Sequence, residues 1–315
     1  SDGTLGGGRF DVVPIGQLNN VGDTVSYDFV ATNDREIKEA SAAIDWALDF
    51  ADLYFISSYA HIEDTLLSDG DFRANPGFIQ LNRSIIESYT QEFRLTSSGT
   101  HRLNWIVGGF HQKRDKRFTF SFLDAEPDGS VPPFVAGDQQ DDFTSSKAYA
   151  LYGHVGYDIT DAIELSAALR YDRDKRTFAT ALDLARDDER AWTQLQPKVS
   201  LSYTVFDGLM TYVGYSKGFR TGGFNETFFS IQPGAYEKEV SDSYELGFKA
   251  SVFDHRMTIN GSVYHIDLKN AQFGVFDANT FAIGNINLRD VSNNGFAIEI
   301  TAKPTTGLTL TSSVS

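Results

Sequence analysis

Apolar and polar residues alternate in the stretch Tyr149-Ala150-Leu151-Tyr152-Gly153-His154-Val155-Gly156-Tyr157-Asp158-Ile159. Tyr149 and Tyr157 share a face with the aliphatic residues between them, whereas Tyr152 and His154 lie on the other face. Successive side chains of a β-strand point to opposite sides, so the pattern predicts a strand with one apolar face. The two tyrosines of that face would lie roughly 27 Å apart along the strand, or roughly 19 Å across a bilayer at ~45° tilt. This spacing fits a strand that crosses a membrane with its rings near the two interfaces.

The same alternation recurs along most of the chain. Apolar residues expected on the outer face are Leu151, Val155, Leu165, Leu169, Leu201, Leu246, Phe248 and Ile298. Charged residues expected on the opposite, lumenal face are Glu164, Arg170, Lys198, Glu245, Lys249 and Glu299. A soluble sheet with one solvated face shows the same alternation, so the pattern by itself leaves both kinds of sheet open. Several runs reach roughly ten residues, which exceeds the ~5–6 usual for globular proteins and favours a membrane sheet.

Very short turns alternate with long polar loops between these runs. The short turns fall at 50–52, 98–100, 160–162, 207–208, 254–255 and 306–307. The predicted strands form hairpins of 36–49 with 53–62, 87–98 with 101–122, 146–159 with 163–179, 193–206 with 209–219, 241–253 with 256–276, and 291–304 with 308–315, and residues 1–35 are predicted to be loop. Tight turns at one end and long loops at the other are typical of an all-β, antiparallel, up-and-down transmembrane β-barrel. A propeller blade of similar spacing would hold four short strands instead of two long ones.

The composition narrows the class of protein further. The net charge of −16 argues against nucleic acid as a partner, because contacts to phosphates need Lys and Arg. No run approaches the ~18 apolar residues of a membrane helix, but a barrel strand needs only ~9–11 residues with every second one apolar. The 25 Phe and 14 Tyr suit aromatic girdles at membrane interfaces. Cys is absent, which fits a thiol-free cytosolic enzyme as well as a bacterial envelope protein.

A second stretch is more specific, and it reads Tyr212-Val213-Gly214-Tyr215-Ser216-Lys217-Gly218-Phe219-Arg220-Thr221-Gly222-Gly223-Phe224-Asn225. It resembles the barrel of TonB-dependent receptors, the active-transport proteins of the bacterial outer membrane, most closely over residues 216–225. Other segments are similar in place and order, namely 92–97 with 105–110, 236–239 with 243–249, and 294–299. The resemblance covers most of the chain beyond the predicted loop 1–35.

The resemblance implies a bacterial outer-membrane receptor, a barrel of roughly 22 strands plugged by an N-terminal domain. It also implies uptake of a scarce small ligand, such as a siderophore–iron complex, cobalamin or a saccharide, powered through the TonB energy-coupling protein. Neither a plug nor the N-terminal box that contacts TonB is visible, and the chain ends at Ser315 instead of an aromatic residue. We therefore expect a fragment with about twelve strands, in contact with outer-membrane lipid and lipopolysaccharide. A passive porin and a soluble β-rich binding module are the alternatives.

The residues that the resemblance marks are Ser216, Lys217, Gly218, Phe219, Arg220, Gly222, Gly223, Phe224 and Asn225. We expect them to act mainly in the structure, with the glycines allowing backbone conformations that are closed to other residues. Phe219 and Phe224 are expected to be girdle rings or loop-packing residues. Lys217 and Arg220 are expected to contact either lipopolysaccharide or a carboxylate of another strand.

Ligand contacts are expected at the long-loop end and in the upper lumen. Long loops carry recognition in this architecture, and the short turns have too few side chains to build a pocket. The candidate ligand-binding residues are Phe228, Phe229, Tyr236, Glu237 and Glu239. Neither a nucleophile motif such as Gly-x-Ser-x-Gly nor a tight metal-ligand spacing of His residues occurs, so no enzyme, metal site or cofactor is predicted.

Overall fold

The chain folds mainly into long β-strands. The structure, a computed structural model, describes residues 30–70, 78–99, 101–124, 139–181, 187–226, 234–277, 279 and 282–315. Its main sheet consists of β1 (Thr32–Ala47), β2 (Ala51–Asp69), β3 (Phe78–Ser97), β4 (Leu103–Asp124), β5 (Gln140–Thr160), β6 (Ile163–Thr180), β7 (Asp187–Phe206), β8 (Leu209–Arg220), β11 (Glu239–Val252), β12 (Met257–Lys269), β15 (Val291–Thr305) and β16 (Leu308–Val314). None of the described residues forms a helix long and apolar enough to cross a membrane.

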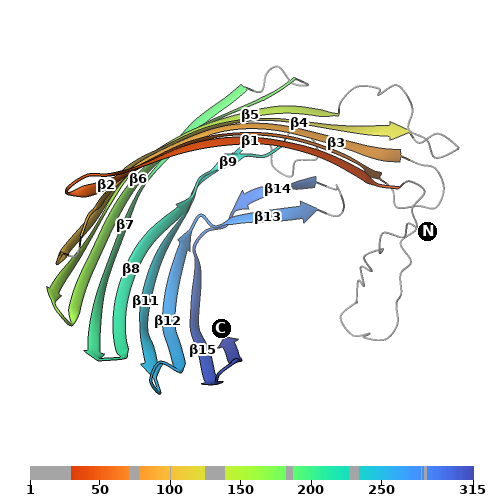
Figure 1. Cartoon of the computed structure of the whole chain (residues 1–315). Coiled ribbons are helices and arrows are strands. Elements are labelled where there is room, and N and C mark those ends of the chain that lie inside the picture. Colours follow the sequence, from red (N-terminus) through yellow and green to blue (C-terminus); the bar gives the residue numbers. More distant parts are fainter. Residues whose placement is uncertain are drawn as a thin grey trace, which may run out of the picture.

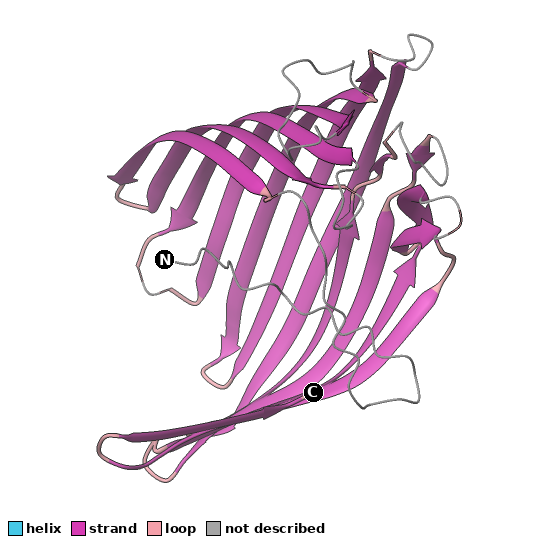
Figure 2. Ribbon diagram, turned by 90° about the vertical axis from the view of Figure 1, so that its right-hand side faces the viewer, coloured by secondary structure: helices cyan, strands magenta, loops and turns pink. Residues whose placement is uncertain are grey.

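The 12 strands of this sheet lie side by side in their order along the chain, each antiparallel to its neighbours. The sheet curves into an open arc with β1 and β16 at its two edges (Figures 1 and 2). Two short hairpins lie outside it, β9 (Gly223–Phe224) with β10 (Ala235–Tyr236) and β13 (Gln272–Asp277) with β14 (Ala282–Asn287). The predicted all-β, up-and-down, incomplete barrel is confirmed.

Several strands are longer than the alternation predicts. β2 and β3 both extend into the segment 63–86, which was expected to be loop, and β1 begins within the segment 1–35. The ends of β1 and β2 carry charged residues on both faces, as at Arg35 and Glu36 and at Glu63 and Asp64, which hides the alternation there. Backbone pairing nevertheless continues there, and ion pairs such as Arg35–Asp64 join β1 to β2.

The strand predicted at 256–276 is in fact two strands. β12 ends at Lys269, and Asn270 adopts a left-handed backbone with a φ of 53°. Residues 272–277 then form β13, which pairs with β14 and not with the main sheet. Asn tolerates a left-handed conformation better than most residues, so the break falls at a position suited to it. Apolar residues continue on both sides of the break, with Ile266 and Leu268 before it and Ala271, Phe273 and Val275 after it, which is why the sequence pattern merges the two strands.

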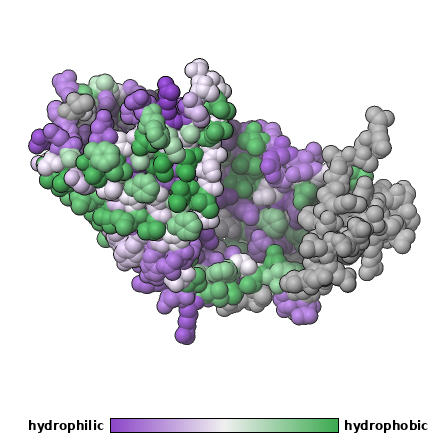
Figure 3. Space-filling model, turned by 90° about the horizontal axis from the view of Figure 1, so that it is seen from below, coloured by the Kyte–Doolittle hydropathy of each residue, from purple (hydrophilic) through white to green (hydrophobic). Residues whose placement is uncertain are grey.

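The apolar face of the sheet is its outer face. Side chains predicted to face outward are exposed, including Leu151 at 70% and Leu246 at 58%. Seen from below, apolar side chains spread over the outside of the arc, and much of its hollowed inner side is polar (Figure 3). An apolar surface of this extent suits contact with lipid. Inside, polar side chains bond across strands, as where the Tyr212 hydroxyl donates to Glu245 Oε1 at 2.5 Å.

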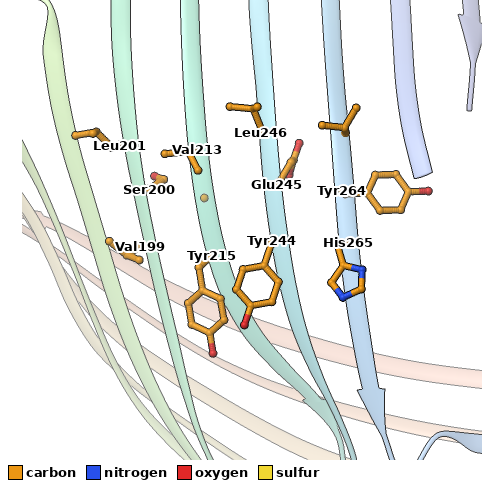
Figure 4. A pocket seen from close by; sticks show the side chains of 12 residues that line it. Val199, Ser200, Leu201, Val213, Tyr215, Tyr244, Glu245, Leu246, Tyr264 and His265 are labelled. Carbon is orange, nitrogen blue, oxygen red and sulfur yellow. The ribbon is translucent and has the colours of Figure 1, made fainter. Parts of the chain in front are cut away.

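Tyrosine rings border the apolar band at its long-loop end. Tyr215 on β8 and Tyr244 on β11 are register partners, with ring centroids 5.2 Å apart. Figure 4 shows Tyr215, Tyr244 and His265 in one row and Leu201, Val213 and Leu246 in the next. A hollow of about 520 Å³ lies among these side chains, and its lining is mostly apolar. It belongs to the lipid-facing surface and offers little to a polar ligand.

Candidate functional site at the loop end of the lumen

The motif 216–225 spans the point where β8 leaves the sheet. Its first part forms the end of β8, paired with β11, and its last part forms β9. Lys217 Nζ lies 3.1 Å from Asp242 Oδ1 on β11. Of the two roles expected for Lys217, the contact with a carboxylate of another strand is therefore present in the structure.

The adjacent glycines of the motif allow close packing. A Cβ at Gly222 would lie 2.4 Å from the carbonyl oxygen of Tyr236 and 2.5 Å from Trp192 Cε2. A Cβ at Gly223 would lie 2.4 Å from the Tyr236 hydroxyl. Neither glycine is among the described residues with positive φ. The expectation that these glycines supply unusual backbone conformations is therefore wrong. Glycine is required at both positions because the neighbouring side chains and backbone leave no room for a Cβ. At Gly218 the corresponding Cβ would lie 2.9 Å from Ser241 Oγ.

Phe224 packs against the inner wall of the barrel. Its ring centroid lies 5.8 Å from that of Phe178 on β6 and 6.1 Å from that of Trp192 on β7. Both partners are buried. Phe224 is thus a loop-packing residue, one of the two roles expected for it, and it holds the segment after β8 against the lumen wall.

Asn225 joins the two short hairpins. Its Nδ2 donates to the carbonyl oxygen of Asn285 at 2.9 Å, and the Asn285 backbone N–H donates to Asn225 Oδ1 at 2.7 Å. The Asn225 backbone N–H also donates to the carbonyl oxygen of Gly234 at 3.0 Å. Asn225 is buried, and its side-chain amide satisfies both the backbone N–H and the carbonyl oxygen of Asn285, as a neighbouring strand would do.

The acidic candidates of the loop form bonds within the protein. Glu237 accepts from Arg190 Nη1 at 2.7 Å and from Trp192 Nε1 at 3.2 Å. Glu239 Oε2 accepts from the Gln272 backbone N–H at 2.7 Å. These bonds anchor residues 237–239 to β7 and β13. Direct contact of Glu237 and Glu239 with a ligand stays a prediction.

Of the other candidates, Tyr236 packs over Gly223, whereas Phe228 and Phe229 lie outside the described residues. Amide side chains that the sequence did not single out complete the anchorage. Asn287 Nδ2 donates to the carbonyl oxygen of Glu237 at 2.9 Å, and Gln272 Nε2 donates to that of Thr221 at 2.9 Å. Asn and Gln are common in polar loops, so no sequence signal marks these two.

A hollow of about 290 Å³ lies on the inner wall beside Phe224. Its lining comes from β4, β5, β6, the motif and the residue after it, and consists of Gln112, Arg114, Lys116, Phe118, Asp142, Thr144, Ser146, Asp174, Arg176, Phe178, Phe224 and Glu226. The strand residues of this set alternate with residues of the outer face, so they point into the lumen. The hollow brings charged groups of both signs next to three phenylalanine rings.

Some charged side chains of this hollow form ion pairs with other protein groups, and others do not. Asp174 is held by Arg176 at 3.0 Å and by the Ser146 hydroxyl at 2.8 Å. In the part of the chain that the structure describes, no carboxylate forms an ion pair with Arg114 or Lys116. These two cations can therefore bind anionic groups of a ligand while the rings contact its apolar parts. No cluster of metal-binding side chains occurs among the described residues.

Sequence reasoning missed this hollow for a physical reason. The segment 111–118 carries charged or polar residues at most positions, so alternation does not show which of them face the lumen. The strand register shows which residues face the lumen, because it pairs Arg114 with Ser146 and Lys116 with Thr144 of β5.

The family model of the TonB dependent receptor-like β-barrel matches residues 1–315. The fold is similar to that of the ferric yersiniabactin uptake receptor FyuA from Yersinia pestis, with a TM-score of 0.71 at 15% identity over 87% of this chain and 41% of that one. The ferric-catecholate import receptor Fiu from E. coli K12 gives 0.65 at 13% identity, over 94% of this chain and 50% of the other. For the copper transporter OprC the TM-score is 0.69 at 13% identity, over 89% of this chain and 45% of that one.

The chain thus spans half or less of the length of these solved structures. Identities this low establish the shared barrel and do not transfer a ligand. The family match over the whole chain agrees with the curved sheet, its apolar outer face and the motif at the end of β8. The chain therefore belongs to the TonB-dependent receptors, and it forms part of the β-barrel that these proteins place in the bacterial outer membrane.

Proposed function

We propose that the protein to which this barrel segment belongs takes up a scarce, anionic small ligand, such as a siderophore–iron complex, with energy from the TonB protein. The observation that carries the proposal is the hollow beside Phe224. It lies on the lumenal wall at the long-loop end, and it offers Arg114 and Lys116 together with aromatic rings. Pockets that combine apolar lining with a few placed polar groups are the usual form for small ligands.

The choice among ligands rests on charge. Arg114 and Lys116 have no ion-pair partner among the described residues, although the chain carries a net charge of −16. Iron chelates with carboxylate or catecholate groups are anionic, whereas cobalamin and saccharides need no such cations. Two of the similar structures are receptors for ferric complexes, which agrees with this choice.

The residues predicted for ligand binding take two roles in this proposal. Tyr236, Glu237 and Glu239 position the loop through their bonds to β7, β13 and the motif. Phe228 and Phe229 belong to the same segment of the sequence and are proposed to contact the ligand. Energy for uptake would come through a contact of the receptor with the TonB protein.

Uptake by a strain that lacks the native receptor tests the proposal. The full-length gene would be supplied as wild type or as Arg114→Gln/Lys116→Gln, and uptake of ferric citrate and of a ferric catecholate would be measured with and without TonB. We expect TonB-dependent uptake of at least one probe. The variant should need an about tenfold higher probe concentration for half-maximal uptake, because charge-assisted contacts are lost. Lys198→Gln/Lys249→Gln is the matched control, since it removes two charges deeper in the lumen.

A passive porin is the second candidate, because porins share the alternation of strand faces. Uptake that persists without TonB would favour it. Equal uptake by the wild type and the Arg114→Gln/Lys116→Gln variant would show that the hollow is not the ligand site, even if transport itself depends on TonB.

A further inference from the structure

Three isoleucines lie in one line across the first three strands, and we call them the isoleucine row: Ile37 on β1, Ile62 on β2 and Ile86 on β3. Ile37 is the register partner of Ile62, and Ile62 is that of Ile86. Register partners lie directly opposite each other and point to the same face of the sheet. The three strands lie side by side at one edge of the arc (Figure 1).

The isoleucine row faces the lumen. The register partner of Ile86 on β4 is Lys116, which lines the lumenal hollow of about 290 Å³. Tyr59 and Tyr89 lie three positions from Ile62 and Ile86 on the same strands, so they lie on the outer face, where their ring centroids are 4.8 Å apart. The row and the hollow therefore share one face of the sheet.

Large aliphatic side chains are an exception on this part of the lumenal wall. The other lumenal positions of β3 from residue 80 to residue 96 are all polar, namely Gln80, Asn82, Ser84, Ser88, Thr90, Glu92, Arg94 and Thr96. On the long-loop side of the row, Arg35 and Asp64 form an ion pair. Ile37 is 53% exposed, and Ile62 and Ile86 are partly exposed. Exposed apolar side chains that are aligned across strands in a polar wall indicate a contact surface.

The row leads directly to the cations of the hollow. It continues from Ile86 to Lys116, and Arg114 is the next lumenal residue of β4. Paired strands lie ~4.8 Å apart, so the path from Ile37 to Lys116 is roughly 14 Å long. An anionic group at Lys116 would therefore lie at one end of an apolar path along the lumenal wall.

From this arrangement we propose that the ligand is amphiphilic, with an anionic group held by Arg114 and Lys116 and an aliphatic chain along the isoleucine row. The inference rests on the proposed function and adds the chemical class of the ligand, an anionic ferric complex with an aliphatic tail. Burial of the tail supplies affinity, about fourfold for each methylene group that is fully removed from water. A ligand without a tail would leave the row in contact with water.

Equilibrium binding to isolated outer membranes that contain the full-length receptor tests the proposal. The probes are the ferric complexes of one catecholate that carries either an acetyl or an octanoyl group, and membranes without the receptor give the background. We expect the wild type to bind the octanoyl complex about tenfold more tightly than the acetyl complex. Ile62→Ser/Ile86→Ser should bind both complexes with the affinity that the wild type has for the acetyl complex, which also shows that the variant is folded.

Two matched variants make the result specific. Ile56→Ser/Ile106→Ser removes two lumenal isoleucines nearer the short turns and should keep the preference for the octanoyl complex. Arg114→Gln/Lys116→Gln should weaken the binding of both complexes to a similar extent and also keep the preference.

The possible outcomes separate this inference from the proposed function. Equal affinity of the wild type for the two complexes, or a preference that persists in Ile62→Ser/Ile86→Ser, would overturn the inference and leave the proposed function intact. It would show that another part of the receptor covers the isoleucine row. An octanoyl preference in a receptor whose affinity does not depend on the two cations would support the row and contradict the anionic ligand. Binding of neither complex would overturn both proposals.

Discussion

Tyr152 lies across Gly108 of the neighbouring strand so closely that a Cβ at position 108 would be 2.4 Å from the phenol ring. The Tyr152 hydroxyl reaches past that glycine to Glu92 Oε1 at 2.6 Å. Because Gly108 has no side chain, the Tyr152 ring can lie over it and form the bond to Glu92. The same pairing recurs at Gly247 beneath Tyr212. Rings that fill glycine positions give the lumenal wall its polar lining and fix strand register.

Gly108→Ala should therefore destabilise the barrel. The new methyl group would also lie 2.7 Å from the backbone oxygen of Phe93, which a side-chain rotation cannot relieve. Overpacking of this kind costs about 1–3 kcal/mol of unfolding free energy. Urea titration of the full-length receptor in lipid vesicles measures it. Gly109→Ala is the control, because its nearest contact would be Leu151 Cδ2 at 3.5 Å. Equal stability of the two variants would contradict the packing argument.

Leu165→Arg tests the orientation of the sheet. Leu165 pairs with Leu201 and Tyr157 on the outer face, within the band that meets lipid. A charged side chain on the lipid face costs about 2–4 kcal/mol at the bilayer midplane and less toward the interfaces. We expect a loss of about 2 kcal/mol in vesicles. Ser202→Arg, one residue from Leu201 and on the lumenal face, should cost clearly less. A larger loss at Ser202 would reverse the assignment of the faces.

The alternation of side chains predicts the fold wherever one face meets lipid. From Tyr149 to Ile159 each odd residue is apolar or glycine, and the whole segment lies within β5. The same signal disappears where both faces meet water, as at Arg35 and Asp64, although backbone pairing continues there. Hydrogen bonds between strands do not depend on side-chain polarity, so the true strands are longer than their apolar parts.

The candidate site was predicted less completely. The motif and its place at the end of β8 follow from the sequence, whereas the reason for its glycines does not. Close approach of Trp192 and Tyr236 to Gly222 depends on residues far apart in the chain. Arg114 and Lys116 carry no signal in a charged segment, and only the register with β5 places them on the lumenal wall.

Gly222→Ala should loosen the loop without unfolding the barrel. The added methyl group would meet the carbonyl oxygen of Tyr236 at 2.4 Å and the Trp192 ring at 2.5 Å, so β9 and β10 would have to move apart. We expect faster cleavage of residues 221–238 by added protease and a change in Trp192 fluorescence. The melting temperature should fall by only a few degrees. Gly214→Ala serves as the control, since its nearest contacts would lie at 3.7 and 3.8 Å. Equal cleavage of both variants would show that the loop is not held at Gly222.

Glu237→Gln separates the positioning of the loop from stability. The Arg190–Glu237 pair is about half exposed on both sides, and exposed pairs contribute roughly 0–1 kcal/mol. We therefore expect a nearly unchanged melting temperature. Affinity for the proposed ligand, a ferric complex, should fall several-fold, because the bonds from Arg190 and Trp192 orient the loop beside the hollow. Equilibrium binding to isolated outer membranes measures this, with Asp254→Asn at the short-turn end as the control. If Asp254→Asn weakens binding and Glu237→Gln does not, the ligand meets the opposite end of the barrel.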